Sequence, residues 1–367
     1  MFGLISKHSG MNTGGVAVSI KRLSNYFAGQ GCRVTILTAH LPPEHLLFEG
    51  LDPEIIHVPI MSRSKIGLAF TLLRHVISSQ PKAILSFDTR ANRINSWLAV
   101  TPFIGVEIWT SLRNSITAGI DPAVAKLSSR VVSIYRKIYR NSTGVIAISQ
   151  GLKNEFQQLT GMTDRGKIHV IHNAVVVEGF YELAGQKVDH PWFDNRTMPL
   201  IISVGRLSTQ KDYPTLIRAF KIVRNTRDCR LLVLGEGEER PVIEALISEL
   251  DLQDDVELRG FVANPLSFVS KANLFALSSV YEGFGNVIAE ALALGVPVVA
   301  TDCPHGPAEI LDSDRYGKLV CVGDVEGLAA AMLEQLSTPV DMDELKKRGA
   351  RFGVDNAKKY LELMGYI

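Results

Sequence analysis

Two glutamates and a glycine-rich turn lie within one short stretch of the sequence. Glu282 comes directly before the turn, and Glu290 follows it eight positions further along the chain. The turn itself consists of Gly283, Phe284, Gly285 and Asn286. Glycine lets a backbone approach a ligand closely, and the free N–H groups at the start of a helix favour an anion such as a diphosphate. The stretch therefore predicts a phosphate-binding loop with a carboxylate on each side.

The residues after this turn have the periodicity of a helix and then of a buried strand at Val296–Thr301. On the helix, Glu290 shares a side with Asn286, away from the broad apolar face. Two carboxylates roughly two helical turns apart would address different parts of one long ligand. The alternative is that both glutamates are solvated surface charges, since Glu is mostly exposed in proteins.

A second group of charges follows the apolar segment Leu200–Val204. Arg206 and Lys211 stand between this predicted strand and a helix that begins near Asp212, in a loop of the kind that faces ligands in parallel sheets. Guanidinium binds phosphate oxygens in a bidentate way, and ammonium adds a compact charge. Both would stabilise the negative charge of a diphosphate. Two solvated cations after a strand are the alternative.

Both groups match one known family. Glu-Gly-Phe-Gly-Asn, the second Glu and the following Ala-Leu-Ala-Leu-Gly-Val-Pro-Val-Val-Ala-Thr-Asp resemble the donor-binding segment of retaining, nucleotide-sugar-dependent glycosyltransferases of the GT-B fold, family four. Gly205-Arg206-Leu207-Ser208 with Lys211 resembles the Gly-Arg-Leu-x-x-x-Lys pattern of these group 1 glycosyltransferases. Residues 168–174, Ile-His-Val-Ile-His-Asn-Ala, resemble the segment that ends their N-terminal domain.

The resemblance implies a role for each site residue. Arg206 and Lys211 would hold the diphosphate, Glu282 would contact the donor sugar, and Glu290 would accept hydrogen bonds from the ribose hydroxyls. The turn after Glu282 would supply backbone contacts. Further donor-binding positions are expected at Gly14 and Gly15, which follow the first strand, at Phe261 and Val262, which would form a wall for the nucleobase, and at Arg113, which stands where the family often has a histidine.

The order of predicted elements indicates two α/β domains. Strand patterns alternate with helix-length segments in each half, which is typical of parallel doubly wound sheets. The strands are expected at Phe2–Ser6, Val34–Thr38, Ile55–Pro59, Ala83–Phe87, Val106–Ser111, Val145–Ser149 and Lys167–Ile171, and then at Leu200–Val204, Arg230–Gly235, Val256–Arg259, Asn273–Leu277, Val296–Ala300 and Leu319–Val322. Two Rossmann-like domains facing across a cleft are also the GT-B architecture that the resemblance implies.

The domain boundaries follow from where periodicity fails. We expect an N-terminal, acceptor-side domain over residues 1–180, an irregular linker over 181–199 and a nucleotide-sugar-binding domain over 200–350. Residues 351–367 are expected to form a C-terminal helix that crosses back to the first domain, as the family does.

Composition excludes several other classes. Apolar residues make up 46% of the 367 residues and charged ones 21%, and no apolar run approaches the length of a membrane span. A net charge of +1 offers no general case for nucleic-acid binding. The four cysteines are widely spaced, so neither a zinc site nor a disulfide framework is indicated, and a cytoplasmic protein is expected.

Two further patterns resemble ligand-binding motifs, but neither is interpreted as a binding site. Residues 235–240, Gly-Glu-Gly-Glu-Glu-Arg, begin like a dinucleotide fingerprint but lack its third glycine, and they predict a strand-to-helix turn. Asp312-Ser313-Asp314 mimics a metal-binding Asp-x-Asp motif but sits in a turn setting, so no metal is expected there.

The sequence therefore predicts a metal-independent, retaining hexosyltransferase that needs no cofactor. Its donor would be a UDP- or GDP-type sugar, and its acceptor a growing, lipid-linked cell-surface glycan such as lipopolysaccharide. One alternative is a nucleotide-sugar epimerase of the same fold. The other is a noncatalytic sugar-nucleotide-binding protein, against which the four charges at the site argue.

A basic segment suggests where such an enzyme would work. Residues 131–140 contain three cations, Arg136, Lys137 and Arg140, among apolar residues and the tyrosines Tyr135 and Tyr139. A segment of this composition could bind the inner surface of a membrane. Peripheral attachment through this segment is one expectation, and a packed helix with a solvated basic edge is the other.

Overall fold

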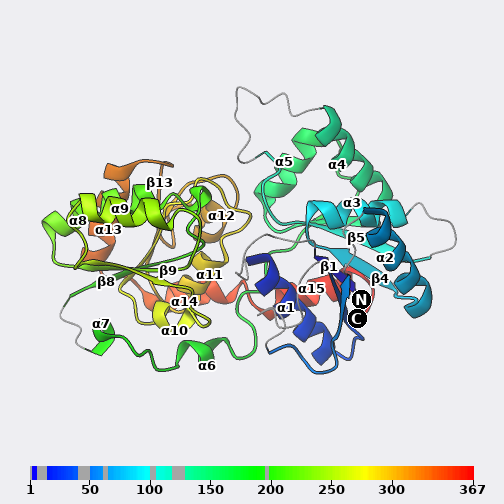
Figure 1. The fold of residues 1–367 in the computed structure, drawn as a ribbon, viewed down its shortest axis with the longest axis horizontal. Helices are drawn as coiled ribbons and strands as arrows, with labels where there is room; N and C mark the ends of the chain where they lie inside the picture. Colours follow the sequence, from blue (N-terminus) through cyan, green and yellow to red (C-terminus); the bar gives the residue numbers. More distant parts are fainter. Residues whose placement is uncertain are drawn as a thin grey trace. The chain divides into compact units, whose positions relative to one another are not determined.

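The computed structural model describes residues 2–5, 15–39, 50–60, 65–99, 105–117, 129–194 and 198–367. The chain forms two compact units (Figure 1). The first unit comprises Met1–Ala174 together with Asp355–Ile367, and the second unit comprises Val175–Val354. Each unit contains one parallel β-sheet with helices packed on it, so the two-domain α/β prediction is confirmed.

The sheet of the first unit has seven parallel strands in the order β3-β2-β1-β4-β5-β6-β7. The strands are β1 (Phe2–Ile5), β2 (Thr35–Ala39), β3 (Ile56–Ile60), β4 (Ala83–Ser86), β5 (Glu107–Leu112), β6 (Gly144–Ala147) and β7 (Ile168–Val170). The helices are α1 (Gly15–Gly29), α2 (Lys65–Ser79), α3 (Thr89–Leu98), α4 (Ser129–Asn141), α5 (Gln150–Thr160) and α15 (Val354–Leu363).

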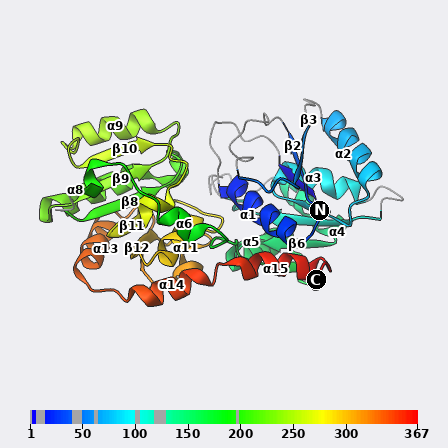
Figure 2. The same ribbon diagram turned by 90° about the horizontal axis from the view of Figure 1, so that it is seen from below.

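The helices of the first unit cover both faces of its sheet. The chain runs outward from β1 to β2 in one direction and from β4 to β5 in the other, so right-handed crossovers place α1 and α3 on opposite faces. α15 lies beside α1, where Tyr360 meets Phe27 with ring centroids 6.4 Å apart (Figure 2). α2 and α3 share one apolar core, which contains Leu72 and Leu98. α1 and α15 therefore form one layer, and α2 to α5 the other.

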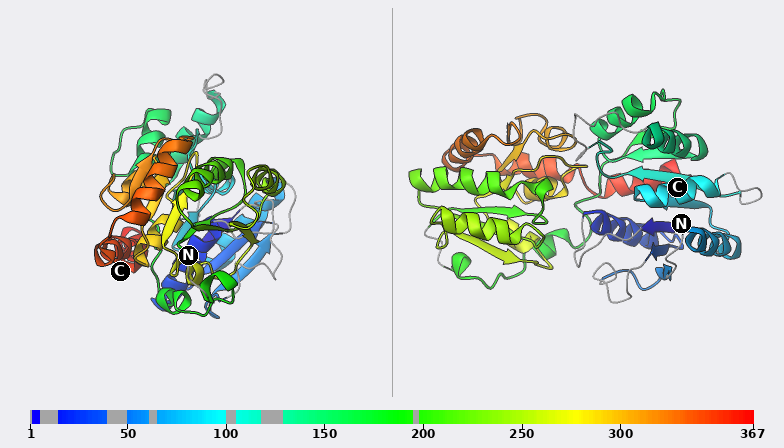
Figure 3. Two further views of the ribbon diagram at one scale, coloured as in Figure 1. Left: turned by 90° about the vertical axis from the view of Figure 1, so that its left-hand side faces the viewer. Right: turned by 45° about the horizontal axis from the view of Figure 1, so that its top comes forward.

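The sheet of the second unit has six parallel strands in the order β10-β9-β8-β11-β12-β13. The strands are β8 (Leu200–Val204), β9 (Arg230–Leu234), β10 (Val256–Gly260), β11 (Leu274–Leu277), β12 (Val298–Thr301) and β13 (Lys318–Val320). The helices are α6 (Phe180–Ala184), α7 (Pro191–Asp194), the 3₁₀ turn η2 (Thr209–Lys211), α8 (Tyr213–Thr226), α9 (Arg240–Glu249), α10 (Leu266–Val269), α11 (Asn286–Ala293), α12 (Pro307–Leu311), α13 (Val325–Ser337) and α14 (Met342–Ala350). Figure 3 shows these helices layered on the sheet from two more sides.

Most strands lie within two residues of their predicted bounds. Every residue of β4, β6, β11 and β12 is buried, because helices cover both faces of each sheet. Such strands appear in a sequence as short, nearly continuous apolar runs. The predicted series of loop, helix, strand and loop around Glu282 is likewise present, as α11 and β12.

The segment between the two sheets is more regular than its sequence suggests. Within residues 181–199, which were expected to be an irregular linker, the structure has most of the short helix α6 and the single turn α7. Phe180 of α6 is 2% exposed and packs in a core cluster with Leu266 of α10, so this segment adheres to the second unit. The polypeptide passes between the units at residues 174–175 and again at 354–355.

The described residues contain no helix that is both long enough and apolar enough to cross a membrane.

Candidate active site

The topology of the second sheet brings together two loops that are distant in the sequence. Strand order reverses between β8 and β11, and ligands of open α/β sheets bind at the carboxyl ends of the strands at such a reversal. The loop after β8 carries Arg206 and Lys211, and the loop after β11 carries Glu282. The charges that the sequence assigns to a donor site thus lie at the position where this fold binds ligands.

Lys211 and Glu282 form an ion pair. Lys211 Nζ lies 2.5 Å from Glu282 Oε1, and the two side chains are only 14% and 9% exposed. Ser279 Oγ donates a second hydrogen bond to the same carboxylate oxygen, at 2.8 Å. The carboxylate is therefore fixed by two donors, and the ammonium is held at the carboxyl edge of the sheet.

Hydrogen bonds between the two loops hold this pair in place. The Val280 amide donates to the Gln210 carbonyl at 2.8 Å, and Gln210 Nε2 donates to the Tyr281 carbonyl at 2.9 Å. Ser278 Oγ donates to the Lys211 carbonyl at 2.8 Å. A third loop joins them, since the Glu282 amide donates to the Pro304 carbonyl at 3.1 Å. These contacts make the site a rigid assembly of three strand ends.

The residues that flank Lys211 have structural roles. Asp212 is the N-cap of α8, and its carboxylate accepts from the Thr215 hydroxyl at 2.7 Å. Tyr213 is 1% exposed, and its hydroxyl donates to the Gly205 carbonyl at 3.2 Å. Burial raises the pKa of Tyr213, so this hydroxyl stays protonated and continues to donate.

Arg206 lies in a more open environment than Lys211. Its guanidinium pairs with Glu238 at 2.9 Å, and the two side chains are 52% and 54% exposed. An ion pair this exposed contributes little to stability, so a diphosphate can compete with Glu238 for the guanidinium.

The turn after β9 explains the fingerprint-like sequence that begins at Gly235. The Leu207 amide donates to the Glu236 carbonyl at 3.0 Å, and the Glu239 amide donates to the Leu207 carbonyl at 3.0 Å. A Cβ at Gly237 would stand 2.1 Å from the Leu207 carbonyl oxygen, so glycine is needed for the two loops to approach. The prediction of a strand-to-helix turn is confirmed, and the turn supports the loop that carries Arg206.

The glycine-rich turn leads into α11, with Gly285 as its N-cap. The side chain of Phe284 is 2% exposed and packs edge-on against Phe352 at 5.3 Å between centroids. Phe284 therefore anchors the turn in the core, and contact between a ligand and the backbone of the turn, Gly283 included, stays a prediction. Asn286 is half-buried, and Glu290 is 8% exposed.

Four further residues were predicted to bind the donor, Phe261 and Val262 in the second unit and Gly14 and Gly15 in the first unit. Phe261 follows β10 and is 42% exposed, while Val262 is half-buried. Phe261 therefore offers an exposed aromatic face at the carboxyl edge, and its role as a nucleobase wall stays a prediction. Gly15 is the exposed first residue of α1, whereas Gly14 lies outside the described residues.

Arg113 belongs to the first unit and is 6% exposed. Its guanidinium donates to Asn173 Oδ1 and stacks over the ring of Phe87 at 4.8 Å. Desolvation lowers the pKa of Arg113, and Nε and Nη2 have no hydrogen-bond partner among the described residues. The structure thus gives Arg113 a packing role beside the end of β4, and donor contact by this residue stays a prediction.

Two residues close to the ion pair, Ser279 and Cys303, were not predicted from the sequence. Ser279 is fully buried and orients Glu282. The sequence feature that could have predicted this role is its position three residues before that glutamate. Cys303 is 3% exposed near the ion pair, where burial and then the charge of Glu282 raise the pKa of its thiol to about 12. Among the described residues, no cluster of three or more His, Cys, Asp or Glu side chains could hold a metal ion.

We expect the four free cysteines to differ strongly in reactivity. The thiolate is the nucleophile, and burial raises the pKa of Cys229 to about 11 and that of Cys303 to about 12. Iodoacetamide at neutral pH should therefore label the exposed Cys321 first, the half-buried Cys32 more slowly, and the other two only after denaturation. Mass spectrometry of timed digests measures this order, and native labelling of Cys303 as fast as Cys321 would contradict the packing described.

Comparison with known proteins identifies the family. The family model described as Glycosyl transferases group 1 matches residues 198–338, and the model described as Glycosyltransferase Family 4 matches residues 13–178. The two matches cover most of both units.

Curated relatives give the same result. N-acetylgalactosamine-N,N'-diacetylbacillosaminyl-diphospho-undecaprenol 4-alpha-N-acetylgalactosaminyltransferase from Campylobacter jejuni is 33% identical over 233 residues, which is 62% of this chain and 60% of that enzyme. The capsular polysaccharide biosynthesis glycosyltransferase CapM from Staphylococcus aureus is 29% identical over 321 residues, 83% of this chain and 81% of that protein. For several relatives the aligned stretch spans only 46% to 60% of their own length.

A solved structure shares the fold over the whole chain. HepE from Anabaena, crystallised in complex with UDP, superposes with a TM-score of 0.79 at 18% identity and covers 100% of both chains. At this identity the likeness shows the fold alone. Together with the two parallel-sheet units and the two family matches, it shows that this chain is a member of the group 1 glycosyltransferases of family four and has the GT-B fold.

Proposed function

We propose that this protein is a retaining glycosyltransferase that moves a hexosyl group from a UDP- or GDP-type sugar to a growing, lipid-linked cell-surface glycan. The observation that carries the proposal is the Lys211–Glu282 ion pair at the strand-order reversal of the second sheet, with Arg206 on the same loop as the lysine. The named activities of the Campylobacter and Staphylococcus relatives support a bacterial glycan as the product.

Each side chain has a chemical role in this proposal. Lys211 and Arg206 bind the diphosphate and neutralise the charge that develops as the bond between sugar C1 and the phosphate oxygen breaks. Glu282, fixed by Lys211 and Ser279, accepts hydrogen bonds from hydroxyls of the donor sugar. Glu290 on α11 would accept from the ribose, and the backbone of the turn before α11 would contact the phosphates.

The reaction requires no protein nucleophile in this scheme. The acceptor hydroxyl attacks C1 on the face that the diphosphate leaves, and its proton passes to a departing phosphate oxygen. The configuration at C1 is therefore retained. The cations at the site supply the charge stabilisation that a metal provides elsewhere, so the proposed enzyme is metal-independent.

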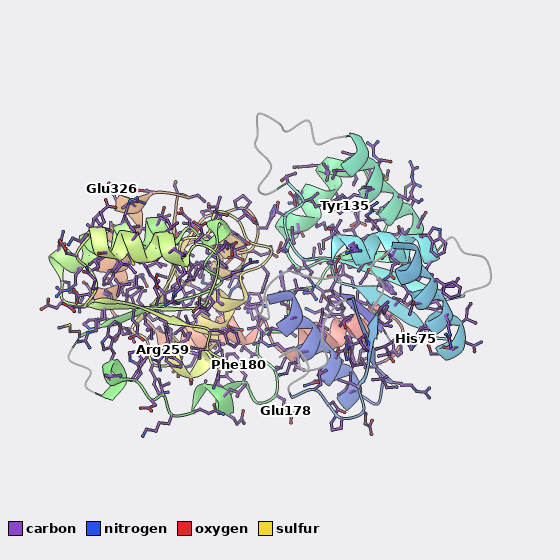
Figure 4. All side chains as sticks on the ribbon, viewed as in Figure 1. His75, Tyr135, Glu178, Phe180, Arg259 and Glu326 are labelled. Carbon is purple, nitrogen blue, oxygen red and sulfur yellow. The ribbon has the colours of Figure 1, made fainter. Side chains whose placement is uncertain are left out.

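Acceptor binding is proposed for the first unit, on the cytoplasmic side of a membrane. A lipid-linked acceptor places the reaction at the membrane surface, and the exposed cations Arg136, Lys137 and Arg140 of α4 support peripheral attachment. The expected contribution of Tyr135 and Tyr139 is wrong. Both rings are buried, with Tyr135 (labelled in Figure 4) hydrogen-bonded to Thr89 and Tyr139 to the Thr163 carbonyl.

A donor panel tests the proposal. We expect one UDP- or GDP-sugar to raise the melting temperature of the purified protein and to be consumed when a lipid-linked acceptor is added, with NMR showing the donor's anomeric configuration in the product. EDTA should leave the rate largely unchanged. Inversion at C1, or activity lost in EDTA and restored by magnesium or manganese, would contradict the mechanism.

The two alternatives give different results in the same panel. A nucleotide-sugar epimerase would isomerise the donor without any acceptor. A noncatalytic binding protein would be stabilised by a nucleotide sugar and would neither transfer nor isomerise it.

A further inference from the structure

The outer layer of the first unit contains three helices without a single acidic residue. α2, α3 and α4 contain no Asp or Glu, although the whole chain has 38 acidic residues against 39 basic ones. Their basic residues are Lys65, Arg74, Arg90, Arg93, Arg130, Arg136, Lys137 and Arg140. Positive charge is thus concentrated on three neighbouring helices of a nearly neutral protein.

The three helices form one continuous layer. α2 and α3 share an apolar core against the sheet, and Asn141 of α4 donates to the Ser96 carbonyl of α3 at 2.8 Å. Figures 1 and 2 both show α2 beside α3. Because their buried residues point toward the sheet, the opposite sides of all three helices face away from it together.

The same outward sides expose large apolar side chains. Phe70 and Ile77 of α2 are 66% and 62% exposed, which makes them the two most exposed large apolar residues of the described chain. Trp97 of α3 is 44% exposed. The exposed Arg74 lies four residues after Phe70 and three before Ile77, so cation and apolar groups alternate along one side of the helix.

We propose that this basic apolar face, formed by the outward sides of α2, α3 and α4, docks on an anionic lipid bilayer. Exposed aromatic and aliphatic groups enter the boundary between headgroups and acyl chains, while neighbouring Lys and Arg pair with lipid phosphates. The apolar component that the buried tyrosines of α4 cannot supply comes from Phe70, Ile77 and Trp97. Docking would bring the enzyme to the lipid-linked acceptor of the proposed function, but the contacts with lipid do not depend on that function.

A bilayer fits this face better than a second copy of this chain or a nucleic acid does. A symmetric contact with a second copy would bury this positive patch against an identical positive patch, because a two-fold interface pairs a patch with itself. A nucleic-acid backbone would attract the cations and leave the exposed Phe70 and Ile77 without an apolar environment.

Flotation of the full chain with lipid vesicles tests the inference. We expect binding to vesicles that contain phosphatidylglycerol and at least about tenfold weaker binding to pure phosphatidylcholine, with the difference reduced by salt. Replacing one exposed cation on each helix, as Arg74→Glu, Arg93→Glu and Lys137→Glu together, should weaken anionic binding about tenfold or more.

The apolar contribution is tested separately. Phe70→Ser with Ile77→Ser should weaken binding about tenfold at every salt concentration, because burial of apolar surface is not screened. Matched controls in the second unit are Val242→Ser with Met342→Ser, which are 54% and 57% exposed, and Arg218→Glu with Arg315→Glu and Lys346→Glu. The controls should bind like the wild type, and all variants should keep its unfolding midpoint.

The alternatives are distinguishable in the same experiment. Equal flotation with both lipids, or unchanged binding by both test variants, overturns the docking face. A dimer that these substitutions disperse without lipid, or RNA binding that they abolish while flotation persists, overturns it in favour of another occupant. Flotation needs no donor, so a protein that floats but transfers no sugar contradicts the proposed function and leaves this inference standing.

Discussion

Lys211→Ala should lower kcat/KM by about a hundredfold or more, because it removes a preorganised cation aimed at the departing diphosphate. Arg206→Ala should have an effect of similar size, since it removes the second phosphate ligand. Lys347→Ala, an exposed lysine on α14, is the matched control and should retain full activity. The measurement is initial rate with the donor identified in the panel, together with the unfolding midpoint of each variant.

Lys211→Ala also leaves Glu282 as a nearly buried carboxylate with Ser279 as its remaining side-chain donor. A double variant, Lys211→Ala with Glu282→Gln, separates the two effects by removing that charge. If the lysine only neutralised the glutamate, the double variant would recover activity. We expect it to recover stability and to remain about a hundredfold slower than the Glu282→Gln single variant, as loss of a transition-state donor requires. Wild-type turnover in both single variants at Arg206 and Lys211 would refute the assignment.

Gly306→Ala should both destabilise the second unit and impair donor binding. Gly306 has φ of +107°, and a Cβ there would lie 1.9 Å from the Phe284 carbonyl oxygen, so the glycine-rich turn would have to move. Strained backbone and steric overlap together should cost about 2–4 kcal/mol in the free energy of unfolding. Chemical denaturation measures the loss, and the donor-induced rise in melting temperature should shrink.

Gly323→Ala is the matched control for this substitution. Gly323 also has positive φ, +77°, but no atom lies within 4 Å of the Cβ position. Its cost should be only the roughly 1–2 kcal/mol of the left-handed conformation, with donor binding unchanged. Equal effects of the two substitutions would show that the contact between Gly306 and Phe284 does not hold the glycine-rich turn in place.

The strands were readable from the sequence because they are buried on both sides. β8 and β9, for example, begin at the residues expected, since Leu200–Val204 and Arg230–Leu234 are short apolar runs between turn residues. The sequence also predicted which residue types form the candidate site. A glycine-rich turn before a helix and two cations after a strand each have local chemistry that needs no knowledge of the fold.

The contacts between these groups could not be read in the same way. Lys211 and Glu282 are 71 residues apart, and they meet because β8 and β11 are neighbours in the sheet, which no local pattern specifies. The sequence did not predict the direction of individual side chains either. Phe284 points into the core, and Tyr135 is buried although its helix carries cations on its outer side. Arg113 is a long cationic side chain whose nearly complete burial depends on Phe87 and Asn173, which are distant in the sequence.

The two passages of the chain between the units have a consequence for synthesis. The second unit is one continuous segment, Val175–Val354, whereas the first unit needs Tyr360 and Leu361 of α15 to complete its core. Domains generally fold as units while the ribosome is still extending the chain, N-terminal domain first. Here the first unit cannot be completed first: its strands are synthesised before the second unit, but its core lacks Tyr360 beside Phe27 until α15, at the end of the chain, has been translated.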